Sequence, residues 1–243
     1  VRVWQSRRVA VRRCESGATG TNGRRGDGFA LDGGAAECLL EYNFAHGNAG
    51  SGFVVTQFPY AHPARDNTLR YNIAQTNGRA AGAGILIEAA HGNPGIFGTV
   101  IAHNAVYAGD PQNGPAFAYV AADGAAPAQR TKVVNNIFLT AAGKTAARGG
   151  ASDWRFAANV FHTSGHAPRF QWEGAVYEGV EAWRQAAGLN AEAGWSGDPR
   201  LRAPGSAPGL ETPRLLPSLS AYLPAADSPV IDKAVPMAYP GLH

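Results

Sequence analysis

Four similar apolar phrases recur in this chain, three of them end on a polar residue, and two of these polar residues are carboxylates. The phrases begin at residues 28, 52, 84 and 116 and end on Asp32, Thr56, Glu88 and Val120. Strands stacked at this interval would place Asp32 and Glu88 in one outward row, with Cα atoms about 10 Å apart. Inverting glycosidases hold their two carboxyl groups roughly 6.5 to 9.5 Å apart, a separation that side-chain rotation would allow here. The pattern predicts an acid and base pair, although two ordinary exposed acids would give the same pattern.

Three further titratable side chains are candidates for the same chemistry. Asp27 stands between two glycines and shares the inward parity of the strand that it precedes, so it either caps a turn or takes part in catalysis. His46 lies in a corner and His91 lies in the loop after Glu88. Histidine can act as a general acid or base near neutral pH, while a hydrogen-bonded corner residue is the alternative for His46. Asp27, His46 and His91 form the second candidate catalytic set.

Loops near the row carry aromatic and basic side chains of the kind that bind sugars. Aromatic faces stack on sugar rings, and arginine forks bind carboxylates. The candidate substrate-binding residues are Phe58, Tyr60, His62, Arg65 and Arg79. Residues 57–66, 89–98 and the basic segment 17–26 would form the walls of a groove, although irregular surface loops would also carry such side chains.

Metal and nucleotide chemistry have little support in the sequence. No histidine or cysteine cluster has the spacing of a zinc site, and no nucleotide-binding phrase occurs. Aspartates at the corners would permit calcium, but the expected chemistry does not require it. We therefore expect no cofactor and no obligatory metal.

Five asparagines indicate the elements that must position these residues. Asn43, Asn72, Asn104, Asn136 and Asn159 follow one another at steps of 29, 32, 32 and 23 residues. A step of 20 to 50 residues is typical of stacked repeats, and the strand phrases are rich in Val, Ile, Leu and Phe between Gly, Asn, Asp and Pro clusters. Leucine-rich and ankyrin patterns are absent. The repeat predicts a parallel β-solenoid in which buried asparagines bond from coil to coil.

The repeat fades after Asn159 and divides the chain into two parts. Residues 1–170 are expected to form the coils, beginning inside the solenoid with Arg13 at the position that Asn43 takes in the next coil. Residues 177–188 read as a short helix ended by a glycine. We expect residues 171–243 to form this helix, capping the solenoid, and an extended tail packed on it. Glu41 and Arg70 should pair on adjacent coils.

Together these residues resemble the right-handed parallel β-helix proteins of the pectin-lyase-like superfamily. The resemblance rests on the asparagine corners, the phrase at 26–34, the turn at 41–43 and the C-terminal residues Trp183, Asp198-Pro199 and 228–232. It implies an all-β, right-handed, single-stranded parallel β-helix, a carbohydrate-active protein, and a secreted or periplasmic location. The Asn-Thr-Asp, Asp-Asp and Gly-His-Gly set of polygalacturonases and the Asp-Pro-His-Glu phrase of mannuronan epimerases are absent, which disfavours those two subfamilies.

The expected function is cleavage of glycosidic bonds in a polysaccharide or oligosaccharide by acid and base carboxylates. Two alternatives remain open: a lyase acting on an acidic glycan, with Arg65, Arg79, His62 and His91 as its cations and base, and a non-catalytic glycan-binding or spike module. The net charge of +3 would suit an acidic polysaccharide, whereas nucleic-acid binding would require a denser basic patch. The sequence has no apolar run of about 18 residues that would span a membrane.

Overall fold

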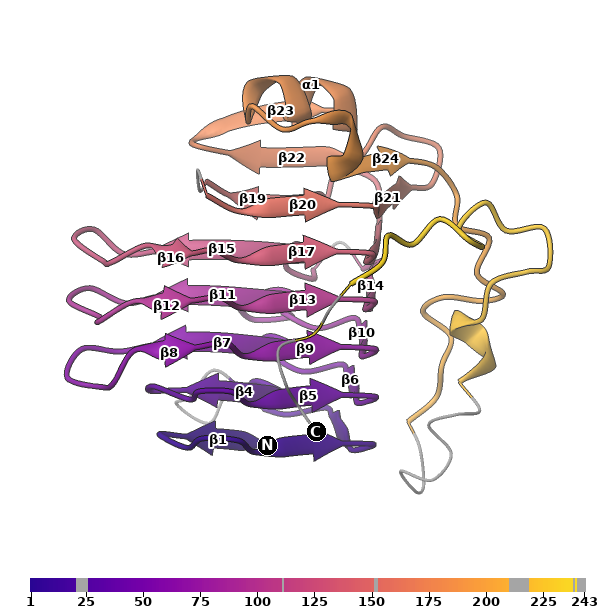
Figure 1. Cartoon of the computed structure of the whole chain (residues 1–243). Helices are drawn as coiled ribbons and strands as arrows, with labels where there is room; N and C mark the ends of the chain where they lie inside the picture. Colours follow the sequence, from indigo (N-terminus) through magenta and orange to yellow (C-terminus); the bar gives the residue numbers. More distant parts are fainter. Residues whose placement is uncertain (21–25, 111, 151–152, 210–218, 238, 240–243) are drawn as a thin grey trace.

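The computed structural model is a stack of coils with sheets running along the stacking axis (Figure 1). It describes residues 1–20, 26–110, 112–150, 153–209, 219–237 and 239. Successive coils contribute neighbouring strands to four sheets, and the strands are parallel apart from one terminal hairpin. The parallel β-solenoid expected from the repeat is confirmed.

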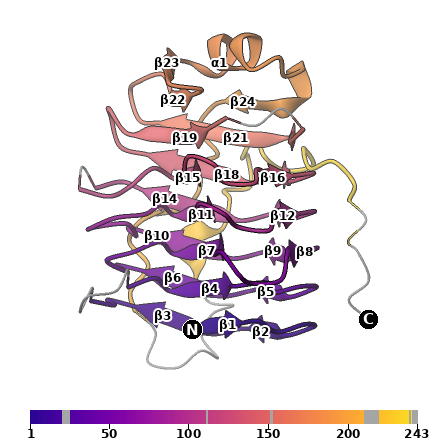
Figure 2. The ribbon, with the colours of Figure 1, turned by 90° about the vertical axis from the view of Figure 1, so that its left-hand side faces the viewer.

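Along each full coil the chain passes through sheets A, C and D in turn, and in three of the coils it also forms a strand of sheet B between sheets A and C. Sheet A contains β1 (Arg2–Trp4), β4 (Phe29–Asp32), β7 (Phe53–Gln57), β11 (Ile85–Ala89), β15 (Phe117–Ala121), β19 (Thr145–Gly149), β22 (Arg169–Trp172) and the antiparallel β23 (Ala175–Glu178). Sheet B is short and contains β8 (Ala64–Arg65), β12 (Ile96–Phe97) and β16 (Ala128–Gln129). Its strands lie beside those of sheet A on one side of the molecule (Figure 2).

Sheets C and D complete the coils. Sheet C contains β2 (Ala10–Arg12), β5 (Leu39–Glu41), β9 (Thr68–Arg70), β13 (Val100–Ala102), β17 (Lys132–Val134) and β20 (Arg155–Ala157). Sheet D contains β3 (Glu15–Gly17), β6 (Phe44–His46), β10 (Ile73–Gln75), β14 (Ala105–Ala108), β18 (Ile137–Thr140), β21 (Asn159–Thr163) and β24 (Gly194–Ser196). All four sheets enclose one core.

Alternate side chains of sheet A fill that core, as the strand pattern predicts. Phe29 pairs with Phe53 in register, and their rings stack with centroids 5.1 Å apart. Both side chains are fully buried, as are Leu31 and Val55 in the next inward row. Burying each of these side chains contributes roughly 1.5 to 3 kcal/mol. The same rows repeat through the coils, so each coil covers the apolar edge of the one before it.

The five asparagines form a continuous buried row, here called the asparagine ladder, at the corner between sheets C and D. Each is at most 2% exposed. Asn72 shows the pattern: its Nδ2 donates to the Leu40 carbonyl at 2.8 Å and to Asn104 Oδ1 at 3.0 Å. Its backbone N–H donates to the same Asn104 oxygen at 3.0 Å. The ladder thereby satisfies buried backbone groups at a corner where strand pairing is interrupted.

The residue before each ladder asparagine turns the chain sharply between sheets C and D. Tyr42, Tyr71 and His103 all have φ of 54°, in the left-handed region that side chains other than glycine rarely adopt. Their side chains point outward and stack across coils, with ring centroids 5.1 Å apart for Tyr42 and Tyr71 and 5.0 Å for Tyr71 and His103. We call these three residues the aromatic corner.

Two expectations for neighbouring coils have different outcomes. Glu41 and Arg70 do pair, with Arg70 Nε 2.7 Å from Glu41 Oε2. Arg13 was expected at the ladder position, but that register is wrong by one residue. Arg13 has φ of 53° and so matches Tyr42, while Cys14 takes the ladder position and its N–H donates to Asn43 Oδ1 at 3.0 Å.

The expected helix is present and lies across the end of the stack (Figure 1). Helix α1 spans Val180–Ala186, and Gly188, with φ of 63°, follows its end. Trp183 on this helix is fully buried and stacks on Phe170 with ring centroids 4.5 Å apart. The expected domain boundary at residue 170 falls inside β22, so the coil pattern continues beyond it.

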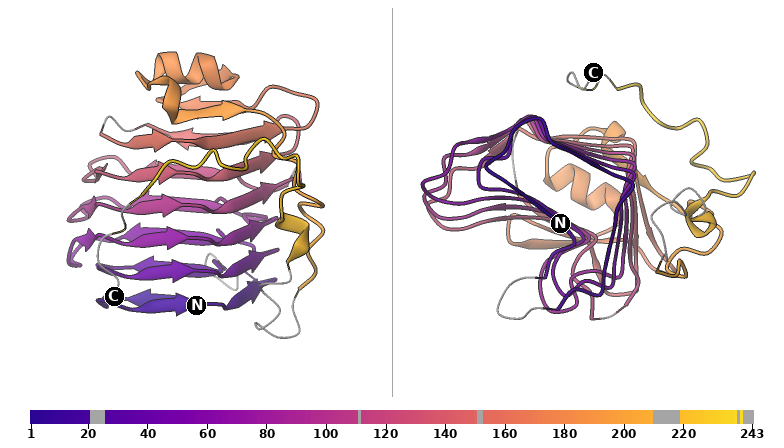
Figure 3. Two further views of the ribbon diagram at one scale, coloured as in Figure 1. Left: turned by 45° about the vertical axis from the view of Figure 1, so that its right-hand side comes forward. Right: turned by 90° about the horizontal axis from the view of Figure 1, so that it is seen from below.

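The tail returns along the outside of the solenoid (Figure 3). Its described residues include the 3-10 helix η3 (Ser220–Tyr222), while the 3-10 helix η1 (Ala191–Ala193) comes earlier, directly before β24 of sheet D. Ala207, Leu219 and Tyr222 pack on Phe44 of sheet D in a small apolar cluster. Gln75 ties the tail to the sheet, because its amide bonds both backbone groups of Ala207, at 2.8 and 3.2 Å, and accepts from the Tyr222 hydroxyl at 2.9 Å.

Candidate functional site

The outward row predicted for sheet A is present. Asp32 pairs with Thr56, Thr56 with Glu88 and Glu88 with Val120 in the strand register. Thr56 Oγ1 donates to Glu88 Oε2 at 3.1 Å. Glu88 is partly exposed and lies at the end of the row nearest Val120.

Asp32 does not have the exposure that the sequence pattern suggested. It faces away from the core, as its parity requires, but only 3% of its surface is accessible. Its Oδ2 forms an ion pair with Arg2 Nε, whose side chain remains half exposed. Asp32 is therefore better placed to hold the first coils together than to meet a substrate.

The second candidate set is not brought together by the fold. Asp27 lies two residues before β4, and its Oδ1 accepts from the Ser51 N–H of the next coil at 2.7 Å, which is a contact between coils. His46 lies on sheet D, stacked over Gln75 as expected, with its Nε2 2.7 Å from Glu15 Oε1. His91 is exposed in the loop after β11, and its Nδ1 lies 2.6 Å from the Asp123 carbonyl.

The predicted substrate-binding residues lie mainly beside sheets A and B. Phe58 packs near Trp4 with ring centroids 5.8 Å apart, and the His62 carbonyl accepts from the Gln57 amide. Tyr60 is fully exposed at the tip of the same loop. The Arg65 guanidinium lies over the Phe97 ring, 4.8 Å from its centroid.

Arg79 lies elsewhere, between β10 and β11, where the chain enters sheet A rather than leaves it. The basic segment 17–26 also enters sheet A, before β4, and residues 21–25 lie outside the described residues. The other two loops, residues 57–66 and 89–98, do follow sheet A, but none of their residues lines the hollow described next.

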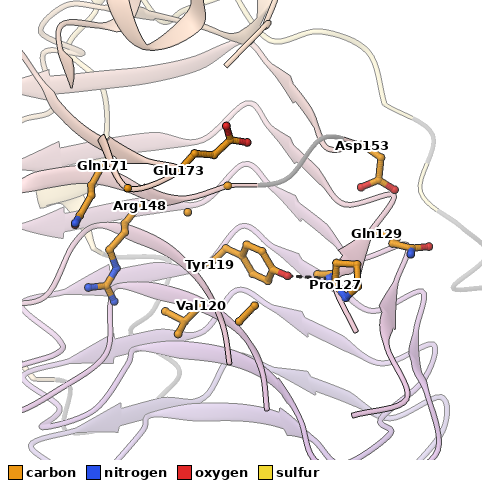
Figure 4. A pocket seen from close by; sticks show the side chains of 13 residues that line it. Tyr119, Val120, Pro127, Gln129, Arg148, Asp153, Gln171 and Glu173 are labelled. Atoms are coloured by element: carbon orange, nitrogen blue, oxygen red, sulfur yellow. Dashed lines mark hydrogen bonds between the residues drawn. The ribbon is translucent and has the colours of Figure 1, made fainter. Parts of the chain in front are cut away.

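A hollow of about 1040 Å³ lies above this region, at the corner between sheets A and B (Figure 4). We call it the A/B groove. Val120 lines it, and because Glu88 pairs with Val120, Glu88 stands one coil below. The polar side chains of the groove come from three successive coils: Tyr119, Gln129, Arg148, Asp153, Gln171 and Glu173.

The charged groups of the groove are available to a ligand. Arg148 stands between Ala118 and Gln171 in the outward register of sheet A. Among the residues that the structure describes, neither Arg148 nor Glu173 has an ion pair or a side-chain hydrogen bond. Asp153 is held across the groove by the Arg130 N–H, which donates to its Oδ2 at 2.9 Å. In Figure 4 Arg148 and Asp153 lie on opposite sides, with Glu173 and Tyr119 between them.

Gly150 makes room for the Glu173 side chain. A Cβ atom at residue 150 would lie 2.8 Å from Glu173 Cγ, closer than real contacts of this kind. Glu173 therefore lies flat against the glycine, in the row that continues from Glu88 through Val120. Glycine is required here by the close approach of the carboxylate side chain.

Tyr119 forms the floor of the groove. Its Oη accepts from the Ala128 N–H at 3.1 Å, so the hydroxyl proton remains available to a ligand. Burial raises the pKa of this hydroxyl, and the backbone hydrogen bond from Ala128 partly opposes the shift. Tyr119 is therefore a neutral donor at physiological pH. Its ring packs on Trp154 with centroids 4.9 Å apart, which fixes its orientation.

The sequence analysis missed the residues that line this groove, yet a signal for them exists. The ladder step from Asn136 to Asn159 is 23 residues, and the step from Arg148 to Gln171 is also 23. Strand β19 lacks a large inward residue at the expected place, where Ala147 follows Phe117 in register. The strand pattern therefore faded at β19, the second coil of the groove, while the asparagine pattern continued.

No metal site is evident in the part of the chain that is described. Within it, no group of three or more His, Cys, Asp or Glu side chains is placed to hold an ion. Over the same residues, no helix has the length and apolar character needed to cross a membrane. Comparison of the chain with family models, curated proteins and solved structures finds no match. Functional inference therefore rests on the geometry of the A/B groove.

Proposed function

We propose that the protein binds a polysaccharide or oligosaccharide in the A/B groove and hydrolyses its glycosidic bonds. The observation that carries this proposal is an open groove of about 1040 Å³ lined by charged and amide side chains from three coils. Such a surface suits an extended polar polymer better than a small apolar ligand, which prefers an enclosed apolar cavity. The amides of Gln129 and Gln171 and the Tyr119 hydroxyl supply hydrogen bonds to sugar hydroxyls.

Glu173 and Asp153 are the proposed catalytic pair. In hydrolysis one carboxylic acid donates its proton to the glycosidic oxygen, which leaves with the bonding electrons. The other carboxylate removes a proton from water as the water oxygen bonds to the anomeric carbon. No described side-chain hydrogen bond holds the Glu173 carboxylate, whereas the Asp153 carboxylate accepts from the Arg130 N–H. This difference favours Asp153 as the fixed base and Glu173 as the acid.

Glu88 extends the proposed site along the row. It lies three strand positions from Glu173, about 14 Å along the stack at about 4.8 Å per coil. That distance is too long for a pair acting on one bond, so Glu88 would meet the polymer a few sugar units away from the bond that is cleaved. We assign Glu88 to substrate binding and leave buried Asp32 outside the reaction.

One observation favours a second candidate function, a lyase acting on an acidic glycan. The Arg148 guanidinium in the groove would bind the carboxylate of a uronic acid and stabilise charge that develops when the proton at C5 is removed. Lyase products contain an unsaturated sugar that absorbs ultraviolet light, so the two reactions are separable by one assay.

A panel of neutral and acidic glycans tests the proposal. Incubation with the protein should release reducing ends without new ultraviolet absorbance. Glu173→Gln and Asp153→Asn should each lower turnover by about 10² to 10⁴, the usual contribution of a positioned acid or base. Glu178→Gln is the matched control, because Glu178 is exposed on the adjacent hairpin strand and lies outside the groove lining.

Three results would count against hydrolysis. Absorbing products would indicate the lyase, and binding without products would indicate a glycan-binding module. Absence of both binding and products across the panel would remove the glycan proposal. Full turnover in Glu173→Gln would remove that residue from the reaction.

A further inference from the structure

The end of the tail is fastened to the solenoid by one side chain next to the aromatic corner. Asn135 Nδ2 donates to the Val235 carbonyl at 2.9 Å, and Asn135 Oδ1 accepts from the Val235 N–H at 2.9 Å. These two bonds resemble one rung of a strand pair. We call residues 233–237 the strap; the chain end that contains it runs past the strands of sheet C in Figure 1, and no strap residue lines the A/B groove.

The same asparagine also contacts His103. Its Nδ2 lies 3.2 Å from His103 Nε2. The two bonds to Val235 fix which end of the amide is nitrogen, because a backbone carbonyl accepts and a backbone N–H donates. His103 Nε2 must therefore accept, which requires a neutral imidazole with its proton on Nδ1. A protonated ring would place N–H against N–H.

We propose that the strap is a pH-controlled latch, which lies closed on the solenoid while the His103 imidazole is neutral and detaches when this ring gains a proton. Detachment would relieve the clash, because a freed Asn135 amide can turn and offer Oδ1 to the new N–H. In the closed state that oxygen already accepts from Val235. Proton binding and strap binding thus compete for one oxygen atom.

The groups around His103 also disfavour protonation of its ring. Its ring stacks on Tyr71, and Tyr239 lies beside it with ring centroids 6.4 Å apart. Arg70 lies over both tyrosine rings, 4.5 Å from the Tyr239 centroid and 5.8 Å from that of Tyr71. The strap adds Lys233, which lines the same hollow as His103. Arg70 is itself paired with Glu41, yet its charge still acts on His103 as that of a nearby cation, so protonation of the ring is unfavourable.

Burial and, next, the Arg70 charge lower the pKa of His103 below its ordinary value of 6.5. Opening the strap exposes the ring and raises this pKa toward the ordinary value. The open state has the higher His103 pKa and therefore binds a proton more readily. By linkage, the closed state becomes less stable relative to the open state as the pH falls below that higher pKa. The latch therefore closes above the ordinary pKa and opens progressively below it.

Opening uncovers a hollow that the strap covers in this structure. It has a volume of about 450 Å³ and lies between the tail and the aromatic corner, lined by Tyr71, His103, Leu223 and Lys233 among others. Acidification would therefore expose aromatic and aliphatic surface on the face opposite to catalysis. This device is independent of the proposed glycan chemistry.

Hydrogen exchange of the Val235 amide tests the latch in the full chain, because this N–H donates only to Asn135 among the described groups. The protection factor, corrected for the intrinsic pH dependence of exchange, would be measured by NMR between about pH 7.5 and pH 5. We expect it to fall roughly tenfold for each unit by which the His103 pKa differs between closed and open states. The protection factor of the Asn104 amide, in the asparagine ladder, is the control, because unchanged protection there shows that the solenoid stays folded.

Two variants make the result decisive. His103→Gln keeps an acceptor for Asn135 but does not titrate, so the Val235 protection should become independent of pH. Asn135→Gly tolerates the left-handed backbone, with φ of 58°, and should lose protection at every pH. A parent protein whose protection does not change with pH, or a His103→Gln variant with the same fall as the parent, would overturn the latch. A Val235 amide unprotected even at neutral pH would do so as well.

Discussion

Replacing Asn104 by alanine should destabilise the solenoid by about 2 to 4 kcal/mol. Asn104 Nδ2 donates to the Leu69 carbonyl and to Asn136 Oδ1, both at 3.0 Å. Its Oδ1 accepts from the Asn72 N–H and Asn72 Nδ2, also at 3.0 Å. Alanine leaves the Leu69 carbonyl and the Asn72 N–H buried without these partners. Each orphaned group costs about 1 to 3 kcal/mol, and the two costs share one cavity and are not fully additive.

Urea unfolding followed by circular dichroism measures this loss. Lys132→Ala is the control, because Lys132 is exposed in the next coil and its replacement should change the free energy of unfolding by less than about 0.5 kcal/mol. Asn104→Asp keeps the shape of the side chain but removes the Nδ2 hydrogen-bond donor. The aspartate keeps an acceptor for Asn72 but faces two other oxygens, so it should destabilise at least as much as alanine. A loss in Asn104→Ala as small as that of the control would refute the ladder as a stabilising element.

Three further predictions follow from other contacts. Trp183→Ala should destabilise by about 3 to 5 kcal/mol in the same unfolding assay, because it removes a fully buried ring from the capped end; a loss below about 1 kcal/mol would show that the helix does not cap the core. Asp32→Asn should lower the melting temperature measurably more than Glu88→Gln, because buried Asp32 holds Arg2 whereas Glu88 is partly exposed; equal melting temperatures would contradict this assignment. The pKa of His103 is lowered in the folded protein, so the free energy of unfolding should decrease as the pH falls below about 6.5. His103→Gln should remove that part of the pH dependence.

The repeat could be predicted from the sequence because its signal is carried by residues with one structural purpose. The ladder asparagines are buried in every coil that contains one, so each of these coils needs the same side chain. The repeat can therefore be recognised even where the step between asparagines changes from 32 to 23 residues. Strand parity is equally robust, because a shift of one residue would turn Phe29 or Phe53 outward. The short helix could be predicted from the segment around Trp183 and from Gly188 at its end.

The candidate site was harder to predict, because outward residues carry no repeat. Asp32 and Glu88 have the same parity, yet Asp32 is buried by a contact with Arg2 that strand alternation does not reveal. The groove depends on residues such as Gly150 and Glu173 from two successive coils, and the first of these coils holds Ala147 at the inward position instead of a large side chain. The strap depends on contacts across about 100 residues of chain, since Asn135 and Val235 are that far apart. Such long-range contacts have no periodic signature.

The central claim is that a glycan binds in the A/B groove, and hydrogen exchange with and without a bound oligosaccharide tests it most directly. A non-hydrolysed fragment of a glycan from the panel, or the Glu173→Gln variant with its substrate, would keep the complex intact. We predict new protection in β15, β16, β19 and β22, around Tyr119, Gln129, Arg148 and Gln171, and unchanged exchange on sheet D. Protection confined to sheet D or to the aromatic corner would contradict the account.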